Sequence, residues 1–431
     1  MTVIAFIVGV LLLVVGLAVS IGLHEIGHLV PAKRFGVRVG RYMIGFGPTL
    51  WSRRIGETEY GVKALPLGGY ISMAGMYPPS PAEEPGRAPG RFFSAMVQDA
   101  RTANDETLGG SADGTFYALP VYKRIIIMLG GPFMNFVLAI VLFAIVFSGI
   151  GLQTATTTIA SVNECVLPAG STQTTCTSSD PASPAAAAGL LPGDEIVSVD
   201  GTAVSTFAEA SAIIQASPGR ALPIVVERDG QRQSLQVTPM LAERQVQGEG
   251  GAVTTAEVGF VGMTATVEYV RQPIWDGPQA ALAQTGQVFG IIWQLPVRVW
   301  DTAVDLVTGQ SRDPNSPLSV VGAGRLAGEV AATDAPILNR VASLLTILGA
   351  LNIALFVFNL IPLLPLDGGH VVVALWDALK RAWAKLFRRP SPRPVDATRL
   401  VPVTFVVVIA LAVMGGVLIL ADIVNPVQLL G

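Results

Sequence analysis

The stretch TVIAFIVGVLLLVVGLAVSIGLHEIGHLVP, residues 2–31, decides how this chain is built. It carries no charge before its first histidine, and a helix needs about 20 apolar residues to cross a bilayer. A membrane span is therefore predicted over about residues 3–31. The span ends in His24, Glu25 and His28, and ionisable side chains at such a position are usually functional. A cleaved signal peptide is the weaker alternative, because no basic residue precedes the apolar run.

Three further stretches are apolar and long enough to cross a bilayer, at about residues 122–150, 341–366 and 400–422. Only 14% of the residues are charged, whereas soluble domains carry about a quarter. The formal net charge of −3 offers no basic surface for nucleic acid. These features predict a polytopic α-helical membrane protein with four transmembrane helices.

The lysines and arginines gather in three regions, 33–63, 123–124 and 380–393. The positive-inside rule places such clusters in the cytoplasm. Both termini and residues 153–335 then lie on the outer side of the membrane. The chain accordingly divides into the predicted regions 1–152, 155–245, 246–335 and 336–431.

Residues 36–75 alternate loosely between apolar and polar and are rich in glycine, which predicts short strands joined by bends. We expect a membrane-associated β-region that dips into the interface, with an ordinary cytoplasmic hairpin as the alternative. Residues 77–115 are rich in proline and alanine and predict a flexible cytoplasmic loop. Residues 378–398 are expected to form a basic cytoplasmic loop. The bends are expected at Gly45, Gly47, Gly68 and Gly69.

Residues 155–245 are predicted to fold as a separate α+β module outside the membrane. The run GLLPGDEIVSVDG, residues 189–201, encodes a turn, a strand and a second tight turn. A predicted helix over 206–216 and a hairpin over 223–238 follow. This order resembles a PDZ domain, a module that binds an extended peptide at a sheet edge. Another small αβ module is the alternative.

The two cysteines, Cys165 and Cys176, lie close together in this module. They fit a disulfide if the module is outside the cytoplasm, and two unpaired thiols otherwise. Residues 246–335 contain several tryptophans and apolar residues at roughly helical spacing. This pattern predicts an amphipathic, helical linker that lies on the outer leaflet or packs on the module.

The sequence His24-Glu25-Ile26-Gly27-His28 is an H-E-x-x-H motif, and two of the three histidines of the chain fall in it. On a helix the two imidazoles share one face and can bind one Zn²⁺, while Glu25 can activate a water molecule. The alternative to a metal site is an ordinary polar helix end at the membrane interface.

A catalytic zinc needs a third protein ligand and an open position. Asp367 is the candidate, because it follows a long apolar run and is the only acidic residue between Asp334 and Asp377. The alternative for Asp367 is a turn or helix N-cap before two glycines.

Together these residues resemble the bacterial site-2 proteases, a family of intramembrane zinc metalloproteases. The single PDZ-like insert is similar to the regulator of sigma-E protease branch of that family. The second proline of the family's N-x-x-P-x-P-x-L-D-G pattern is displaced here by one residue, to Pro365. The matching segments are His24–His28, Gly45–Pro48, Pro66–Tyr70, Gly131–Asn135, Asn359 with Pro362, and Leu366–Gly368.

The resemblance implies a bacterial inner-membrane enzyme that cleaves peptide bonds within single-span membrane proteins, such as anti-sigma factors or remnant signal peptides. It implies Zn²⁺ held by His24, His28 and Asp367, with Glu25 as catalytic base and acid. Asn359 is implied to contact the substrate. The glycine-rich β-region, with Gly45, Gly47, Gly68 and Gly69 as its substrate-binding residues, is expected to hold the unwound substrate as an added strand. The extracytoplasmic PDZ-like domain would bind a peptide or act as a size filter, and membrane lipid surrounds the spans.

Two other functions would use the same residues. A zinc-dependent membrane transporter or metal sensor would bind the same ion. A transport path for the metal would require a second buried acidic or histidine site along the spans, and the sequence offers none. A catalytically silent PDZ scaffold would not need Glu25, because zinc binding alone does not use that side chain.

Overall fold

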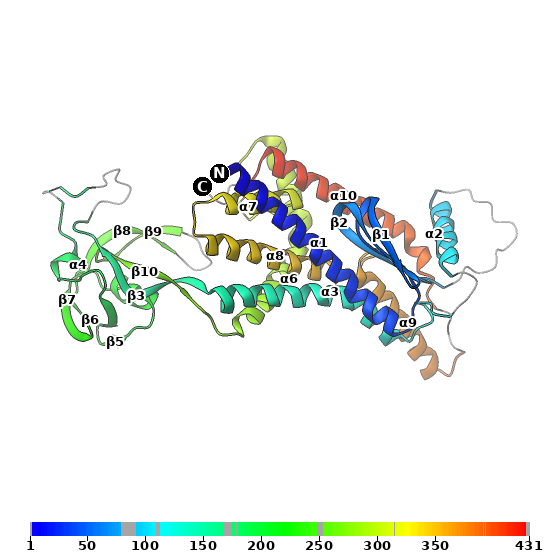
Figure 1. The fold of residues 1–431 in the computed structure, drawn as a ribbon, viewed down its shortest axis with the longest axis horizontal. Coiled ribbons are helices and arrows are strands. Elements are labelled where there is room, and N and C mark those ends of the chain that lie inside the picture. Colours follow the sequence, from blue (N-terminus) through cyan, green and yellow to red (C-terminus); the bar gives the residue numbers. More distant parts are fainter. Residues whose placement is uncertain are drawn as a thin grey trace. The chain divides into compact units, whose positions relative to one another are not determined.

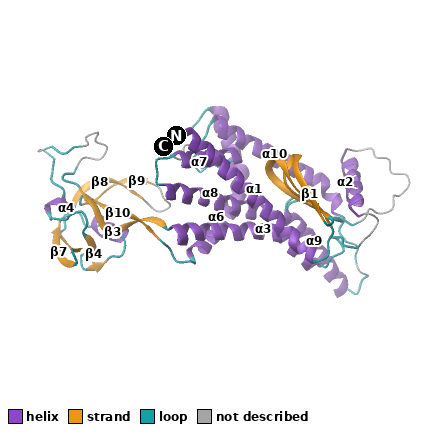
Figure 2. Ribbon diagram, viewed as in Figure 1, coloured by secondary structure: helices purple, strands orange, loops and turns teal. Residues whose placement is uncertain are grey.

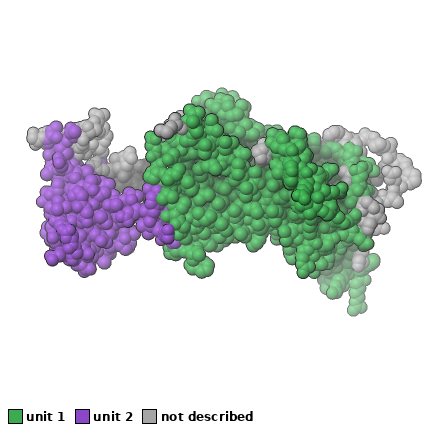
Figure 3. Space-filling view, viewed as in Figure 1, with its two compact units in different colours: residues 1–150, 273–431 green, residues 151–272 purple. Residues whose placement is uncertain are grey.

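A computed structural model describes residues 2–78, 92–108, 113–166, 175–177, 180–247, 253–313, 315–390, 392 and 394–427. The chain forms two compact units (Figure 3). The first comprises Met1–Ile150 and Pro273–Gly431, and the second comprises Gly151–Gln272. The first unit is mainly helical with one strand pair, and the second is mainly strands (Figure 2).

Among the described residues, four helices of the first unit are long and apolar enough to cross a membrane, in agreement with the four predicted spans. α1 packs against α3, and α3 packs in turn against α8 (Figure 1). The third span differs from the prediction of 341–366, because the helix ends at Asn359 and a turn occupies 360–366. The four helices are α1 (Thr2–Arg34), α3 (Val121–Ala144, continued by the π-helix Ile145–Ile150), α8 (Ile337–Asn359) and α10 (Val401–Val424, preceded by the 3-10 turn Ala397–Leu400).

The predicted β-region is present as two long strands, β1 (Val39–Ile55) and β2 (Thr58–Met73). Each strand folds back at its glycines, where Gly45 and Gly68 have φ of 92° and 94°. Residues 39–44 therefore pair with 69–73 on one side, and residues 41–44 also pair with 59–62 on the other. The segment 69–73 is left as an edge. Large apolar side chains are exposed near the bends, including Leu50 and Trp51 at 70% and 58%.

The segment 77–115 was expected to be a flexible loop. Residues 79–91 and 109–112 lie outside the described residues, but 92–108 form the helix α2 (Phe92–Leu108). The prolines that suggested a loop all precede this helix. Asn104 holds α2 in place, because its side chain accepts from Tyr77 N and donates to Tyr77 O, at 3.1 and 3.0 Å. Arg101 Nη2 donates to Asp396 Oδ2 at 2.6 Å.

The basic segment 378–398 was also expected to be a loop, but α9 (Asp367–Leu386) covers its first part. Apolar residues recur every three or four positions here, so the charges lie on an amphipathic helix. A buried ion pair fixes this helix to α3, with 3.1 Å between Arg124 Nη1 and Asp377 Oδ2.

Residues 246–335 are only partly helical, contrary to the prediction. α6 (Asp276–Thr308) and α7 (Val320–Ala332) pack on the spans, where Gly277 meets Ala144 of α3 and Gly9 of α1 meets Ala327. The beginning of the region instead contributes strands to the second unit. These are the end of β8 (Met240–Gln247), β9 (Val253–Phe260) and β10 (Met263–Val270).

The second unit, Gly151–Gln272, is therefore larger than the predicted module 155–245. Its sheet runs in the order β10-β3-β4-β6-β7, with β5 paired to β4. Ile196, Val199 and Leu222 lie in its core. The elements not yet placed are β3 (Leu152–Val162), β4 (Glu195–Val199), β5 (Thr202–Ala203), β6 (Leu222–Arg228), β7 (Gln231–Val237), α4 (Pro184–Ala187) and α5 (Phe207–Gln215).

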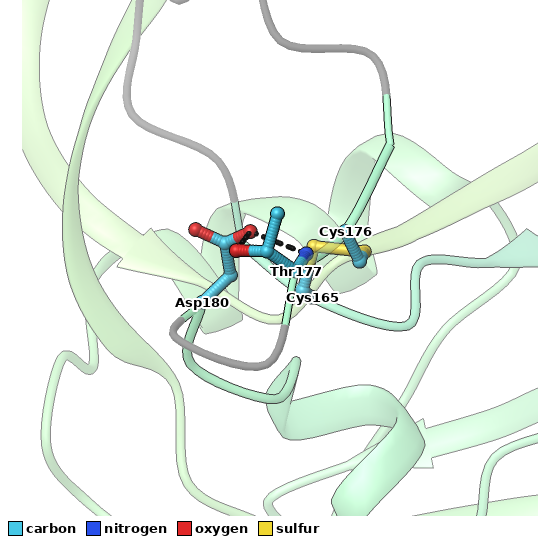
Figure 4. Close-up of a disulfide and its surroundings, with 4 residues drawn as sticks. All are labelled: Cys165, Cys176, Thr177 and Asp180. Carbon is cyan, nitrogen blue, oxygen red and sulfur yellow. Dashed lines mark hydrogen bonds between the residues drawn. A yellow bond between two sulfur atoms is a disulfide. The ribbon is translucent and has the colours of Figure 1, made fainter.

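A disulfide and an ion pair stabilise loops of the second unit. Cys165 and Cys176 form a disulfide, beside a turn in which Asp180 accepts from Thr177 N at 2.7 Å (Figure 4). Of the two alternatives that the sequence left open, the structure therefore has the disulfide. Arg228 donates two hydrogen bonds to the buried Asp194 carboxylate, and they hold the pKa of Asp194 below its usual range.

Candidate metal and catalytic site

Side chains from two distant parts of the sequence converge near the C-terminal end of α1. His24 and His28 lie one helical turn apart, and their Nε2 atoms are 3.2 Å from each other. Asp367, the first residue of α9, brings its Oδ2 to 3.3 Å from His24 Nε2 and 3.4 Å from His28 Nε2. Each of the three offers one ligand atom, and these atoms lie within 4.8 Å of one another.

This arrangement fits a Zn²⁺ ion. Asp367 Oδ2 is buried and has no hydrogen-bond partner among the described residues. A buried acceptor without a partner is unfavourable, and a cation beside it removes that cost. Two imidazole nitrogens and one carboxylate oxygen are the donors that zinc prefers, and three protein ligands leave the open position of a catalytic site.

The rear nitrogen of His28 fixes which ring atom faces the metal position. His28 Nδ1 lies 2.7 Å from Ile127 O, so Nδ1–H donates to this carbonyl of α3. The lone pair of Nε2 then points toward Asp367. A backbone carbonyl behind a ligating histidine is a common way to set its tautomer and orientation.

Asn135 of α3 has the same relation to His24, with its amide 3.1 Å from His24 Nδ1. The two ends of an amide have the same shape, and the metal site favours one orientation. With Oδ1 toward His24, the amide accepts from Nδ1–H and leaves Nε2 free for the ion. This orientation also gives a donor to Asn135 Oδ1, which is otherwise buried without a partner among the described residues.

α3 can approach the two histidines this closely because it presents glycines to them. A Cβ built at Gly131 would overlap His28 Nε2 and lie 2.8 Å from His24 Cε1. One residue earlier, Gly130 meets Gly27 of α1 backbone to backbone. Gly131 and Asn135 match a family motif in the sequence, but neither was predicted to support the metal site. The available signal was their spacing of four residues, which places Gly131 and Asn135 on the same face of one helix.

We expect Gly131→Ala to weaken zinc binding at least tenfold, because displaced ligands or a displaced outer-shell partner typically cost about 10–100-fold in metal affinity. Zinc content after dialysis against a weak chelator measures the effect. Gly149→Ala is the matched control, since its Cβ would meet only Ile145 Cγ2 at 3.9 Å. Equal zinc retention by both variants would contradict this account of the helix contact.

Glu25 is buried, at 7% exposed, and lies within electrostatic range of all three candidate ligands. The edge segment of the β-region borders it, because a Cβ built at Gly69 would lie 3.1 Å from Glu25 Cγ. Tyr42 of β1 donates to Gly22 O of α1 at 2.7 Å, and burial raises the pKa of Tyr42 to about 12. The tyrosine therefore stays protonated and ties the β-region to α1.

The described contacts of the other residues predicted to touch substrate are to groups outside the three candidate ligands and Glu25. Asn359 ends α8, and its side chain donates to Leu355 O at 3.0 Å. The contacts found for Gly45, Gly47 and Gly68 are within the β-region, to Leu65 and Phe46. Of the predicted glycines, Gly69 alone is placed beside Glu25 by these contacts.

The chain was compared with known proteins. The profile of Peptidase family M50 matches residues 12–389. Zinc metalloprotease Rip1 of Mycobacterium tuberculosis is 35% identical over 433 residues, which cover 98% of this chain and 99% of that protein. Rip1 of Mycolicibacterium smegmatis is 33% identical over 440 residues, covering 98% of both chains. Metalloprotease MmpA of Caulobacter vibrioides is 28% identical over 399 residues, covering 88% of both.

Proposed function

Because this chain belongs to peptidase family M50, the site-2 protease family, we propose that it cleaves peptide bonds within the membrane at the site formed by His24, His28 and Asp367. The chain is a membrane metalloprotease with zinc as its cofactor. The observation that carries the finer proposal is the convergence of the three candidate ligands beside Glu25, at the end of a span-length helix.

In the proposed mechanism, His24, His28 and Asp367 would hold Zn²⁺, and the ion would supply Lewis acidity for a substrate carbonyl and a water molecule. Glu25 accepts the proton of the attacking water and later delivers it to the leaving amine. Its burial beside the edge of the β-region keeps this exchange away from bulk solvent. Ile127 O and Asn135 keep both histidines in the tautomer that presents Nε2.

The substrate is proposed to be an unwound segment of a single-span membrane protein, of the anti-sigma factor or remnant signal peptide kind. Residues 69–73 support this, because among the described residues they pair only with 39–44 and leave one edge free beside Glu25. A substrate strand added there would expose its amide bonds to the site. The family pattern assigns Asn359 to substrate contact. Its side-chain amide would give up its hydrogen bond to Leu355 O and donate to the substrate backbone instead.

We propose the orientation in which the second unit is extracytoplasmic and the metal site faces the cytoplasmic side of a bacterial inner membrane. The disulfide Cys165–Cys176 supports this, because disulfides persist in oxidising compartments. The basic clusters of the first unit support it independently. The second unit is proposed to be a PDZ-like module, either binding a peptide or excluding substrates with large outer domains.

Reconstitution into vesicles with a purified single-span substrate tests the function. We expect cleavage inside the substrate's span, loss of cleavage on removing zinc with a chelator, and recovery when zinc is returned. Helix-breaking residues near the cleaved bond should accelerate the reaction, since unwinding precedes it. Zinc accumulation inside the vesicles without any cleavage would favour the transporter alternative instead.

A further inference from the structure

α9 exposes a continuous apolar face that the proposed reaction does not use. Spacings of three and four place its large side chains on one side of the helix. The rings of Trp383 and Phe387 also contact each other, with centroids 4.6 Å apart. These side chains are between 50% and 75% exposed: Leu375, Trp376, Leu379, Trp383, Leu386 and Phe387.

The opposite face of α9 is locked to the protein, so the apolar face cannot turn inward. Ala374, Asp377 and Ala384 are buried there. Asp377 pairs with Arg124 of α3 and also accepts from Val395 N at 2.8 Å. Isolated apolar side chains are normal on protein surfaces, but a contiguous patch of this kind indicates a binding surface.

Basic residues occupy the polar side of the last turns of α9 and the positions just beyond the helix. They are Lys380, Arg381, Lys385, Arg388 and Arg389. The only acidic residue of α9 after Asp367 is Asp377, which is buried against Arg124. The exposed charge at this end of α9 is therefore entirely positive.

Length decides where α9 lies relative to a bilayer. α8 has 23 residues, about 34 Å of helix, which already matches the roughly 30 Å thickness of the hydrocarbon core. α9 follows after the turn at 360–366, so it begins where the span ends and its later turns lie beyond the span. A helix with tryptophan and leucine on one face and basic residues beside them is typical of a membrane interface.

We propose that the outer face of α9 is seated in the membrane surface and binds anionic phospholipid headgroups. The apolar side chains enter the boundary of the acyl chains, and Arg381, Lys385 and Arg388 meet the phosphates. Because Asp367 is the first residue of α9, this contact sets the position of the third candidate zinc ligand against His24 and His28. The lipid contact is independent of the proposed protease function, whereas its effect on cleavage rests on that function.

Fluorescence quenching tests the contact on the full chain in nanodiscs made of equal parts phosphatidylcholine and phosphatidylglycerol. Bromine is placed on the acyl chains of one lipid or the other. Subtracting the fluorescence of the Trp376→Phe/Trp383→Phe variant from that of the wild type isolates the emission of the two α9 tryptophans. We expect stronger quenching by brominated phosphatidylglycerol than by brominated phosphatidylcholine. Each basic side chain near an anionic surface strengthens binding to that surface about fivefold. Arg381→Gln/Lys385→Gln/Arg388→Gln should bring the two lipids to equal quenching.

The tryptophans of α6 provide the matched control. Trp293 and Trp300 are 86% and 70% exposed, and the charged residues near them, Arg298, Asp301 and Asp305, are of mixed sign. The signal isolated by Trp293→Phe/Trp300→Phe should not distinguish the two lipids. If α9 is quenched by neither lipid, its face is covered by protein or water and the proposal is wrong. Equal quenching of wild-type α9 by both lipids would overturn the anionic preference.

Cleavage in the same nanodiscs tests the link to the site. We expect wild type to be severalfold faster in the mixture than in pure phosphatidylcholine, and the neutralised triple variant to be equally slow in both. The same rate for wild type in both lipids would overturn the positioning role. If wild type cleaves in neither, the proposed protease function fails, while the quenching result still decides the lipid contact.

Discussion

Replacing Glu25 by glutamine is expected to abolish peptide-bond cleavage while leaving zinc bound. Glutamine keeps the size of the buried side chain beside Gly69 but cannot accept a proton from water. A positioned general base contributes about 10²–10⁴-fold to a rate, so the residual activity should fall by that factor or more. Zinc should remain at the wild-type ratio, because the group formed by His24, His28 and Asp367 does not include Glu25.

Both quantities are measured on one preparation, by metal analysis and by cleavage of the single-span substrate. Glu329→Gln is the control for the same chemical change, since the described ion pair of Glu329 is with Arg325, one turn away on α7. Wild-type activity in Glu25→Gln would exclude Glu25 as the base. Loss of zinc together with activity would indicate that Glu25 is a ligand or holds the site together.

Replacing Asp367 by asparagine is expected to release the metal and, with it, all activity. The carboxylate supplies the negative charge of the candidate ligand set, and Oδ2 faces both histidines at 3.3 and 3.4 Å. Loss of an outer-shell partner costs about 10–100-fold in metal affinity, and loss of a ligand should exceed this. Equilibrium dialysis against a zinc buffer measures the change.

Asp301→Asn on the exposed face of α6 serves as the control for this substitution. Circular dichroism of both variants reports whether the helices remain folded. Tight zinc binding by Asp367→Asn would mean that Asp367 only begins α9 and that the third ligand is another group. That outcome would return Asp367 to the turn or N-cap alternative.

The spans and the H-E-x-x-H motif were predictable because each depends on residues close together in sequence. A run of apolar residues identifies a membrane helix from composition alone, and positions 24 and 28 share a face on any α-helix. The β-region was predictable for the same reason, since its glycines mark the bends locally. α2 and β10 were not, because proline-rich and polar neighbours obscured their periodicity. Their partners are also distant in sequence, since Arg101 of α2 pairs with Asp396 and β10 pairs with β3.

The sequence by itself determined a four-span membrane protein with a His pair and a glutamate at the end of its first helix. Only the tertiary structure decided that Asp367 meets this pair, that Ile127 O and Asn135 lie behind the two imidazoles, and that Gly131 lets α3 approach them. The physical reason is that a metal site needs donor atoms within a few ångströms. Packing of α1, α3 and α9 sets those distances, and local periodicity carries no information about them.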